Sequence, residues 1–379
     1  KSSGDERQIR RVTRMGLWIS LVYGALTMPI MWWSEPIFHL LRQESVVAEG
    51  AQEYLRIAGW GIFPALFVMV LKSYLSALEK TQIVLWITVL AAALNVPLNW
   101  MLIYGNLGMP ELGIEGAALA SLAMNALSIG VMTVYVARTL PEHALFQNMW
   151  RADPEALRRV FRLGWPIGIT NLSEVGLFAM STVMMGWLGV YPQAAHVIAL
   201  QIASATFMFH LGLSNAATVR AGHAHGRQNE TELRDGAVAA FGLSAGFVVL
   251  TIAAFLLFPE PLIGIFMKPD EAARSEILAI GVVLLALAAL FQAVDAAQVM
   301  ALGLLRGVQD TRVPMIWAAI AYWVIGMPAS YYLGFEAGWG GAGVWLGLTF
   351  GLLVAAVALM WRFWRVAVHI EPAPATAAS

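Results

Sequence analysis

Two acidic residues stand in the middle of long apolar stretches of this sequence. Glu174 lies in GITNLSEVGLFAM (168–180), and no Lys or Arg occurs between Arg162 and Arg220. Asp295 lies in LFQAVDAAQVM (290–300). A carboxylate at the centre of a bilayer costs roughly 2.5–3.5 kcal/mol even on insertion scales, so it faces protein or water and is functional by default. The two acids could hold a cation or share a proton; the alternative is a pair of hydrogen-bonded structural acids.

Polar and aromatic side chains accompany both acids at helical spacing. Thr170 and Asn171 precede Glu174 by four and three residues, which places all three on one helical face. One glutamine lies three residues before Asp295 and another three residues after it, and a phenylalanine lies one turn earlier. The candidate substrate-lining residues are therefore Thr170, Asn171, Phe178, Phe291, Gln292 and Gln298.

A third polar group lies in an earlier apolar segment. Asn95 and Asn99 stand one turn apart around Pro97, which donates no backbone hydrogen bond and leaves the Ala93 carbonyl without its usual partner. Ser121 in the following segment could join them. These oxygens could bind a cation, although they lack an anion, and hydrogen bonding between helices explains them equally well.

The solvent around these residues follows from composition. The chain is 59% hydrophobic and 12% charged, with a mean hydropathy of +0.69 over 379 residues. No single soluble core absorbs that much apolar surface, whereas a bilayer does. A net charge of −1 gives no basic field for nucleic acid, and the absence of cysteine excludes disulfides and thiolate metal sites.

Ten windows of about twenty apolar residues predict an all-α membrane protein. They are 15–33, 54–78, 82–104, 113–136, 163–189, 194–216, 236–258, 277–305, 314–335 and 341–364. If ten helices alternate in direction, nineteen of the 23 Lys and Arg residues fall on one side of the membrane. The positive-inside rule then predicts that both termini are cytoplasmic.

The sequence also repeats itself. Short motifs recur in the same order at separations of 225 to 231 residues, such as Pro97 with Pro328 and Gly116 with Gly343. Helices one to four therefore repeat as helices seven to ten, whereas helices five and six have no counterpart. We expect twelve helices in two six-helix lobes related by a parallel pseudo-two-fold repeat, with the first two helices preceding Lys1.

This repeat predicts the domain organisation. Residues 1–138 form the N-lobe, 139–159 a cytoplasmic linker, 160–366 the C-lobe and 367–379 a disordered tail.

Taken together, these motifs resemble the multidrug and toxic compound extrusion (MATE) family, nearest its bacterial NorM-like branch. The segments that carry the resemblance include LGWPIGITNLSEVGLF, AVDAAQVMALGLLRGVQDT and NVPLNWMLIYG, and it covers residues 4 to about 366. It implies a monomeric antiporter in the bacterial inner membrane that exports organic cations in exchange for H⁺ or Na⁺, with no cofactor and no enzymatic activity.

The resemblance also assigns roles to residues. Glu174 and Asp295 match the two acids of the C-lobe cation site and would be the metal ligands if the ion is Na⁺. Asn95, Asn99 and Ser121 match the N-lobe polar site. Phe291 stands where the sodium-coupled pattern has a tyrosine hydroxyl, so we favour H⁺, because two close carboxylates can share one proton.

Three alternatives remain open. A flippase for lipid-linked oligosaccharides would need central cationic residues, and helices five to eight show no Lys or Arg at mid-membrane depth. A membrane-embedded enzyme would need a nucleophile and a base together; the histidines, including His223 and His225 in a loop, are predicted to be peripheral except His210. An inactive truncated fragment is the third alternative.

Overall fold

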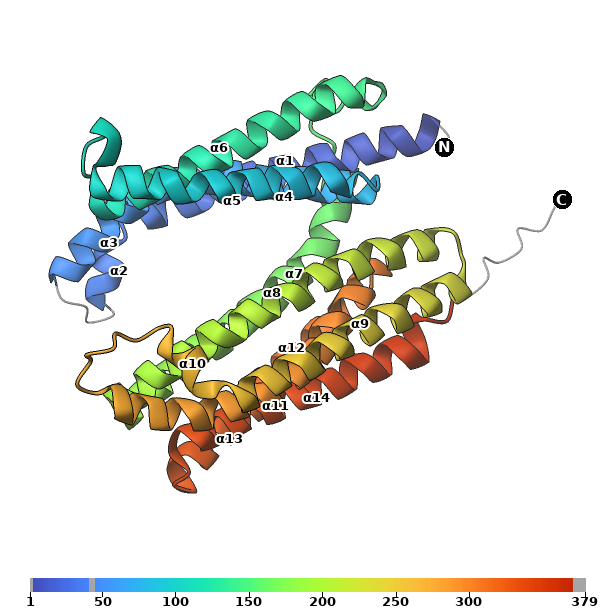
Figure 1. The fold of residues 1–379 in the computed structure, drawn as a ribbon. Helices are drawn as coiled ribbons and strands as arrows, with labels where there is room; N and C mark the ends of the chain where they lie inside the picture. Colours follow the sequence, from blue (N-terminus) through green and yellow to red (C-terminus); the bar gives the residue numbers. More distant parts are fainter. Residues whose placement is uncertain (1–2, 41–44, 371–379) are drawn as a thin grey trace. The chain divides into compact units, whose positions relative to one another are not determined.

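The computed structural model describes residues 3–40 and 45–370. Within that part of the chain, ten helices are long and apolar enough to cross a membrane. The chain divides into two compact units, residues 1–162 and 163–379, and the division falls inside helix α7 (Figure 1). The predicted all-α polytopic membrane fold is confirmed. Of the predicted tail, residues 371–379 lie outside the described residues.

The first unit consists of α-helices joined by short 3₁₀ turns. Its helices are α1 (Ser3–Trp32), α2 (Glu35–Leu40), α3 (Ser45–Ala58), η1 (Gly59–Gly61), α4 (Ile62–Ala77), α5 (Thr81–Tyr104), η2 (Asn106–Gly108), α6 (Gly113–Thr139), η3 (Pro141–His143) and the first turns of α7 (Pro154–Leu188). A core of apolar side chains from α4, α5 and α6 holds it together, with Leu71, Leu75 and Met132 almost fully buried.

The second unit holds the longest helices of the chain. Besides most of α7 it contains α8 (Val190–Gly226), α9 (Glu230–Leu257), α10 (Pro259–Gly264), α11 (Arg274–Gly307), α12 (Arg312–Ala319), η4 (Ile320–Gly326), α13 (Met327–Tyr331), η5 (Tyr332–Glu336), α14 (Gly340–Arg362) and η6 (Phe363–Ala367). The stretch from α12 to η5 is one membrane span with π-helical turns on both sides of Pro328, which lacks the N–H that a regular helix needs.

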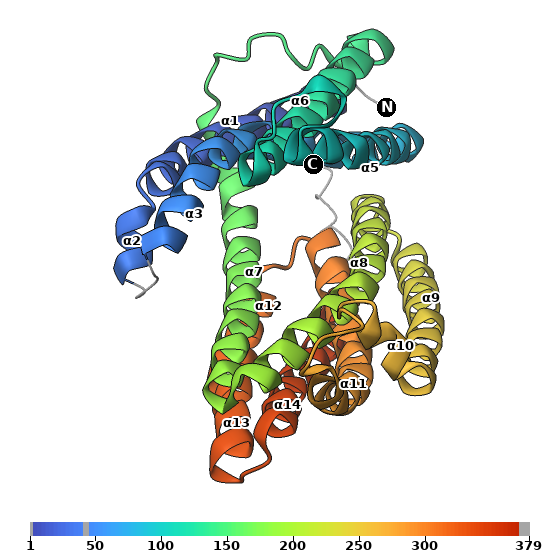
Figure 2. The same ribbon diagram turned by 60° about the vertical axis from the view of Figure 1, so that its left-hand side comes forward.

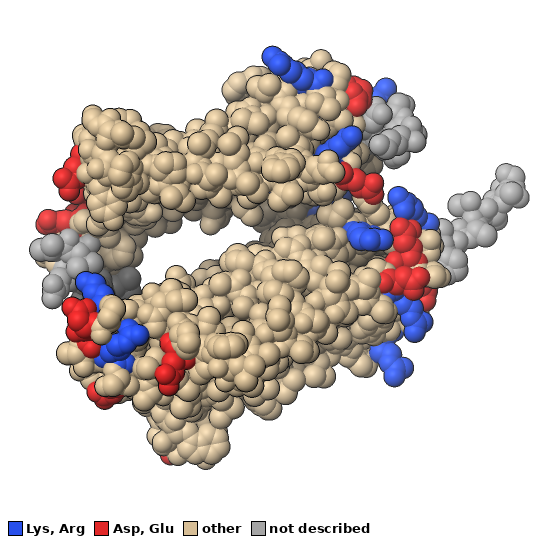
Figure 3. Space-filling view, viewed as in Figure 1, with Lys and Arg blue, Asp and Glu red and all other residues tan. Residues whose placement is uncertain are grey.

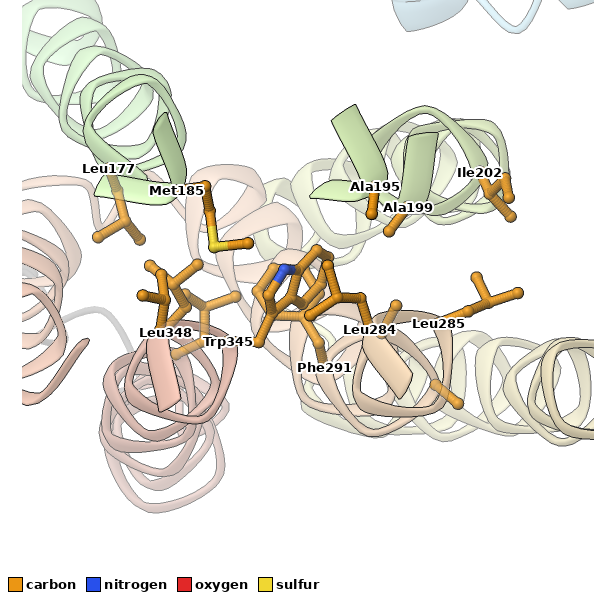
Figure 4. Close-up of a cluster of buried hydrophobic side chains, with 14 of the residues drawn as sticks. Leu177, Met185, Ala195, Ala199, Ile202, Leu284, Leu285, Phe291, Trp345 and Leu348 are labelled. Carbon is orange, nitrogen blue, oxygen red and sulfur yellow. The ribbon is translucent and has the colours of Figure 1, made fainter. Parts of the chain in front are cut away.

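Apolar side chains from α7, α8, α11 and α14 interlock in the middle of this unit (Figure 4). Trp345 is fully buried and lies edge-on to Phe291, with ring centroids 5.5 Å apart. Leu177 and Met185 of α7 close the cluster from the other side. This packing fixes the faces of α7 and α11 that carry Glu174 and Asp295.

Helices α8 and α11 make the most extensive contact in the second unit, and α9 packs beside both (Figure 2). Ser214 Oγ donates a hydrogen bond to the Val299 carbonyl at 2.7 Å, and Thr218 Oγ1 donates to the Gly303 carbonyl at 2.8 Å. At Gly303 and Gly307 a Cβ atom would collide with the α8 backbone. Glycine and hydroxyl side chains thus allow the two backbones to touch.

The internal repeat is visible in backbone detail. Gly116 of α6 packs against the Leu102 carbonyl of α5, and Gly343 of α14 packs against the Leu333 carbonyl of η5. Two residues after α4 ends, Glu79 lies in the left-handed region (φ 60°), and two residues after α11 ends, Gln309 has the same conformation (φ 64°). The short helices α2 and α10 occupy matching positions in the order of elements. The repeated motifs are therefore those that shape the backbone.

The segment that precedes α7 is attached to α1. Asp153 accepts a hydrogen bond from the Ala156 N–H at 3.1 Å and so caps α7, while Pro154 occupies the first helical position. Arg11 binds both Asp153 and Glu155. The Arg11 guanidinium and the Ala156 N–H hold the pKa of the Asp153 carboxyl well below its usual range.

On the face drawn in Figure 3, Lys, Arg, Asp and Glu gather at the two ends of each unit, and the long sides between them carry none. The sides expose large apolar residues such as Leu26, Trp86 and Val249. Each unit thus has a belt suited to lipid, bounded by polar ends.

Candidate functional site: an acid-lined cavity in the second unit

A single face of α7 brings polar and aromatic residues to a cavity. Asn171, Glu174 and Phe178 all line it, and Glu174 is half-buried. Thr170 does not line it, because its hydroxyl is buried and donates to the Pro166 carbonyl at 2.9 Å. The Pro166 carbonyl belongs to the same helix, so the Thr170 hydroxyl uses its proton in a hydrogen bond within α7.

Helix α11 supplies the opposite wall through residues spaced by about one turn. These residues are Phe291, Asp295, Val299, Leu302 and Arg306. Asp295 is 6% exposed, and its Oδ1 atom has no hydrogen-bond partner among the described residues. A buried carboxylate oxygen without a partner is energetically costly unless a proton, a cation or a water molecule binds to it.

The cavity has a volume of about 470 Å³. Side chains of α8, including Leu200, Ser204 and Phe207, form its third wall. At one end Phe178 and Phe291 meet edge to face with ring centroids 5.8 Å apart, and at the other end Arg306 Nη2 donates to Asn171 Oδ1 at 2.9 Å. Helices α7 and α11 therefore run in opposite directions, with the two acids between an aromatic end and a polar end.

Arg306 corrects the sequence analysis. The two acids were expected to have no basic partner in their helices, but Arg306 in the last turn of α11 lines the same cavity as both acids. From the sequence it counts as a cytoplasmic residue at a helix end. Its long side chain reaches back along α11 to Asn171, which no pattern in the sequence indicates.

Tyr322 is a second residue that the sequence analysis missed. It is fully buried in η4 and accepts a hydrogen bond from Gln298 Nε2, on α11 one turn after Asp295. The neighbouring Trp323 donates to the Ser173 carbonyl at 3.3 Å, which sets η4 against α7 beside Glu174. A hydroxyl is thus held between α7 and α11, although it comes from another helix than Phe291.

The two glutamines of α11 lie outside the cavity lining. Gln298 is fully buried, and its Nε2 is used by Tyr322. Gln292 is 3% exposed, and neither of its amide atoms has a hydrogen-bond partner among the described residues.

The predicted polar site of the first unit is more open. Asn99 Nδ2 donates to the Asn95 carbonyl at 2.9 Å, and Asn95 Oδ1 is buried without a hydrogen-bond partner in the part of the chain described. Ser121 is exposed. The contact of Gly116 with Leu102 places Ser121 level with Pro97, because α5 and α6 run in opposite directions.

A buried histidine contradicts the expectation that only His210 lies inside the protein. His196 is fully buried, accepts a hydrogen bond from Trp345 Nε1 at its Nδ1 (3.1 Å) and contacts Thr182 Oγ1 through Nε2 (3.1 Å). Because an indole N–H only donates, Nδ1 must carry a lone pair, and His196 is neutral. His210 is also buried and pairs with Ser244 at 3.0 Å.

The donors around the cavity are oxygens and one guanidinium. The carboxylates of Glu174 and Asp295, the Asn171 amide oxygen and the Ser204 hydroxyl are hard ligands that suit H⁺ or Na⁺ as a transported ion. No cluster of three or more His, Cys, Asp or Glu residues suited to a metal exists among the described residues.

The fold and this cavity define a class: a polytopic α-helical membrane protein with an ionisable chamber between its helices. The MatE family model matches residues 2–101 and 166–332. "Probable multidrug resistance protein NorM" of Rhizobium meliloti is 43% identical over 374 residues, which span 98% of this chain and 80% of that protein. The protein of the same name from Agrobacterium fabrum is 39% identical over 362 residues, 95% of this chain and 78% of that one.

Solved structures show the same fold. The eukaryotic MATE transporter AtDTX14 superposes with a TM-score of 0.85 at 19% identity, over 97% of this chain and 81% of that one. A MOP superfamily transporter from Pyrococcus furiosus gives 0.84 at 21% identity, over 98% and 81%. This chain belongs to the MATE family, and its relatives point to a transporter rather than an enzyme.

Proposed function

We propose that this protein exports organic cations and other amphipathic drugs across the bacterial cytoplasmic membrane in exchange for a coupling cation. The observation that carries the proposal is one cavity in which Glu174 and Asp295 lie beside Phe178 and Phe291. Carboxylates attract a cation, and aromatic faces bind it further when it is desolvated. The names of the relatives as multidrug resistance proteins support drugs as the substrates.

The coupling ion that we propose is H⁺. Asp295 presents a buried unpaired oxygen, and a carboxylate pair binds one proton with no further ligand. Na⁺ would need several more oxygens, and the side chains that line the cavity add only those of Asn171 and Ser204. Exchange then requires only that the ion and the drug favour different conformations of the cavity.

The remaining assignments rest on the sequence. We propose Asn95, Asn99 and Ser121 as a second polar site, and a topology with both termini cytoplasmic. The topology is supported by the placement of nineteen of the 23 Lys and Arg residues.

Arg306 is the one observation that favours the alternative of a lipid-linked oligosaccharide flippase, because a guanidinium can bind phosphate. Two carboxylates share the cavity with it and would repel an anionic headgroup. We therefore keep drug export as the proposed function.

Transport of ethidium in proteoliposomes tests the proposal. Glu174→Gln and Asp295→Asn should each abolish transport in protein that is purified in normal yield. Asp270→Asn, an exposed acid in a loop of the same unit, is the control and should transport like the wild type. Transport at the wild-type rate by either cavity variant would contradict the assignment of the site.

Imposed ion gradients test the coupling ion separately. Efflux should follow a pH gradient at constant Na⁺ and ignore a Na⁺ gradient at constant pH. The reverse result would replace H⁺ by Na⁺ while leaving the two acids as the site.

A further inference from the structure

The cavity contains a positive charge of its own. Arg306 lines it together with Glu174 and Asp295, and its guanidinium is held at 2.9 Å by the Asn171 side chain. Asn171 and Glu174 are one helical turn apart on the same face of α7. The hydrogen bond to Asn171 therefore holds the guanidinium on the face of α7 that carries Glu174, within the same cavity.

The charge balance follows from these three groups. Arginine remains charged in proteins, whereas a carboxylate can be neutralised by a proton. With both acids ionised the three groups sum to one negative charge, and with one acid protonated they sum to zero. Without Arg306 the corresponding sums would be two negative charges and one.

We propose that Arg306 is a tethered counter-ion that limits the cavity to one substrate charge at a time. Arg306 neutralises part of the field of Glu174 and Asp295, so the cavity binds a monovalent organic cation and disfavours a divalent one. This inference rests on the proposed function, because it specifies the charge of the exported cation. Asn171 is the positioning residue that holds the guanidinium at this place.

A purely structural role for Arg306 makes a different prediction. Arg306 lies in the last turn of α11, where a cation is favoured by the exposed carbonyl groups of the helix end. If that were its whole role, its removal would lower stability and weaken all ligands alike. Charge selectivity distinguishes the two roles.

The experiment compares ethidium with propidium, which carries the same ring system and one additional quaternary ammonium. Fluorescence anisotropy gives the dissociation constant of each dye for purified wild-type protein, Arg306→Gln and Arg306→Lys. Wild-type protein should bind ethidium more tightly than propidium. Arg306→Gln should lower the dissociation constant of propidium at least about tenfold more than that of ethidium. The interaction with one nearby unit charge has that magnitude at a dielectric constant between those of water and the protein interior.

Comparing each dye with itself across variants removes the effect of dye size. Arg306→Lys keeps the charge and should keep the wild-type preference. Asn171→Ala frees the guanidinium without removing it. It should shift the preference toward propidium, as Arg306→Gln does, but by a smaller factor. This variant also tests the proposal if Arg306→Gln does not fold.

Glu174→Gln in the Arg306→Gln background should return the propidium preference toward the wild-type value, because one negative charge is removed with the positive one. The counter-ion role is overturned if Arg306→Gln changes the dissociation constants of both dyes by the same factor. It is also overturned if Arg306→Lys behaves like Arg306→Gln. If neither dye binds the wild-type protein, the proposed function itself fails, and this inference fails with it.

Discussion

The hydroxyl of Tyr322 joins η4 to α11, because it accepts a hydrogen bond from Gln298. Both side chains are fully buried, so each depends on the other for a hydrogen bond. The ion proposed for coupling decides whether this hydroxyl is a ligand or only a support. For a proton it is a support, because the acids bind the proton themselves.

Tyr322→Phe should therefore destabilise the protein while leaving proton-driven efflux in place. The loss should be about 1–3 kcal/mol, because the Gln298 amide is left buried without its partner. Thermal unfolding in detergent and efflux under a pH gradient measure the two effects. Efflux abolished in a well-folded variant would identify the hydroxyl as an ion ligand and weaken the case for H⁺.

At the scale of elements, the start of α7 depends on two interactions that meet at Asp153. The carboxylate caps α7 through the Ala156 N–H and pairs with Arg11 of α1. The apolar pattern predicted a span from 163, whereas α7 begins at Pro154. The extra turns are polar and amphipathic, and their helical structure is explained by the cap and the proline rather than by hydrophobicity.

Asp153→Ala should lower the melting temperature at pH 7 more than Asp153→Asn, because asparagine still caps the helix and loses only the ion pair. The pKa of Asp153 in the folded protein is below its ordinary value of 3.8, so the unfolded chain binds the proton more tightly. The ion pair therefore contributes stability above the unfolded-state pKa, and this contribution is lost as the pH falls below it.

Melting curves of the wild type and Asp153→Asn at several pH values measure this contribution. Their difference should be constant from neutral pH down to about pH 5 and should shrink below about pH 4. A difference that grows on acidification would contradict the ion-pair role.

At the scale of the whole molecule, the sequence predicted what depends on composition and spacing. Ten apolar windows gave ten spans, because length and apolarity alone decide whether a helix can cross a bilayer. Glu174 and Asp295 were identifiable because a carboxylate is conspicuous in an apolar segment. Arg306 and Tyr322 were not, because an arginine at a helix end and a tyrosine in a span are common features of membrane boundaries and packing.

The repeat also predicts equivalent sensitivity at two glycines far apart in the chain. Gly116→Ala and Gly343→Ala both place a Cβ against a backbone carbonyl, of Leu102 and Leu333 respectively, and each should destabilise the protein by about 1–3 kcal/mol. Gly130→Ala in α6 meets no atom within 4 Å and is the matched control. Thermal unfolding of the three variants checks this, and tolerance of one glycine variant but not the other would contradict an equivalent role.

The contact between α8 and α11 also restricts how the substrate range of this protein can evolve. Gly303 and Gly307 have no room for a larger side chain, so the distance between these two helices cannot increase in small steps by substitution there. New specificity must instead arise from side chains that face the cavity, such as Ser204, Phe207 and Leu211. Selection for resistance to bulkier compounds, followed by sequencing, should recover substitutions at those positions. Recovery of active variants at Gly303 or Gly307 would show that the contact between α8 and α11 tolerates larger side chains than its packing indicates.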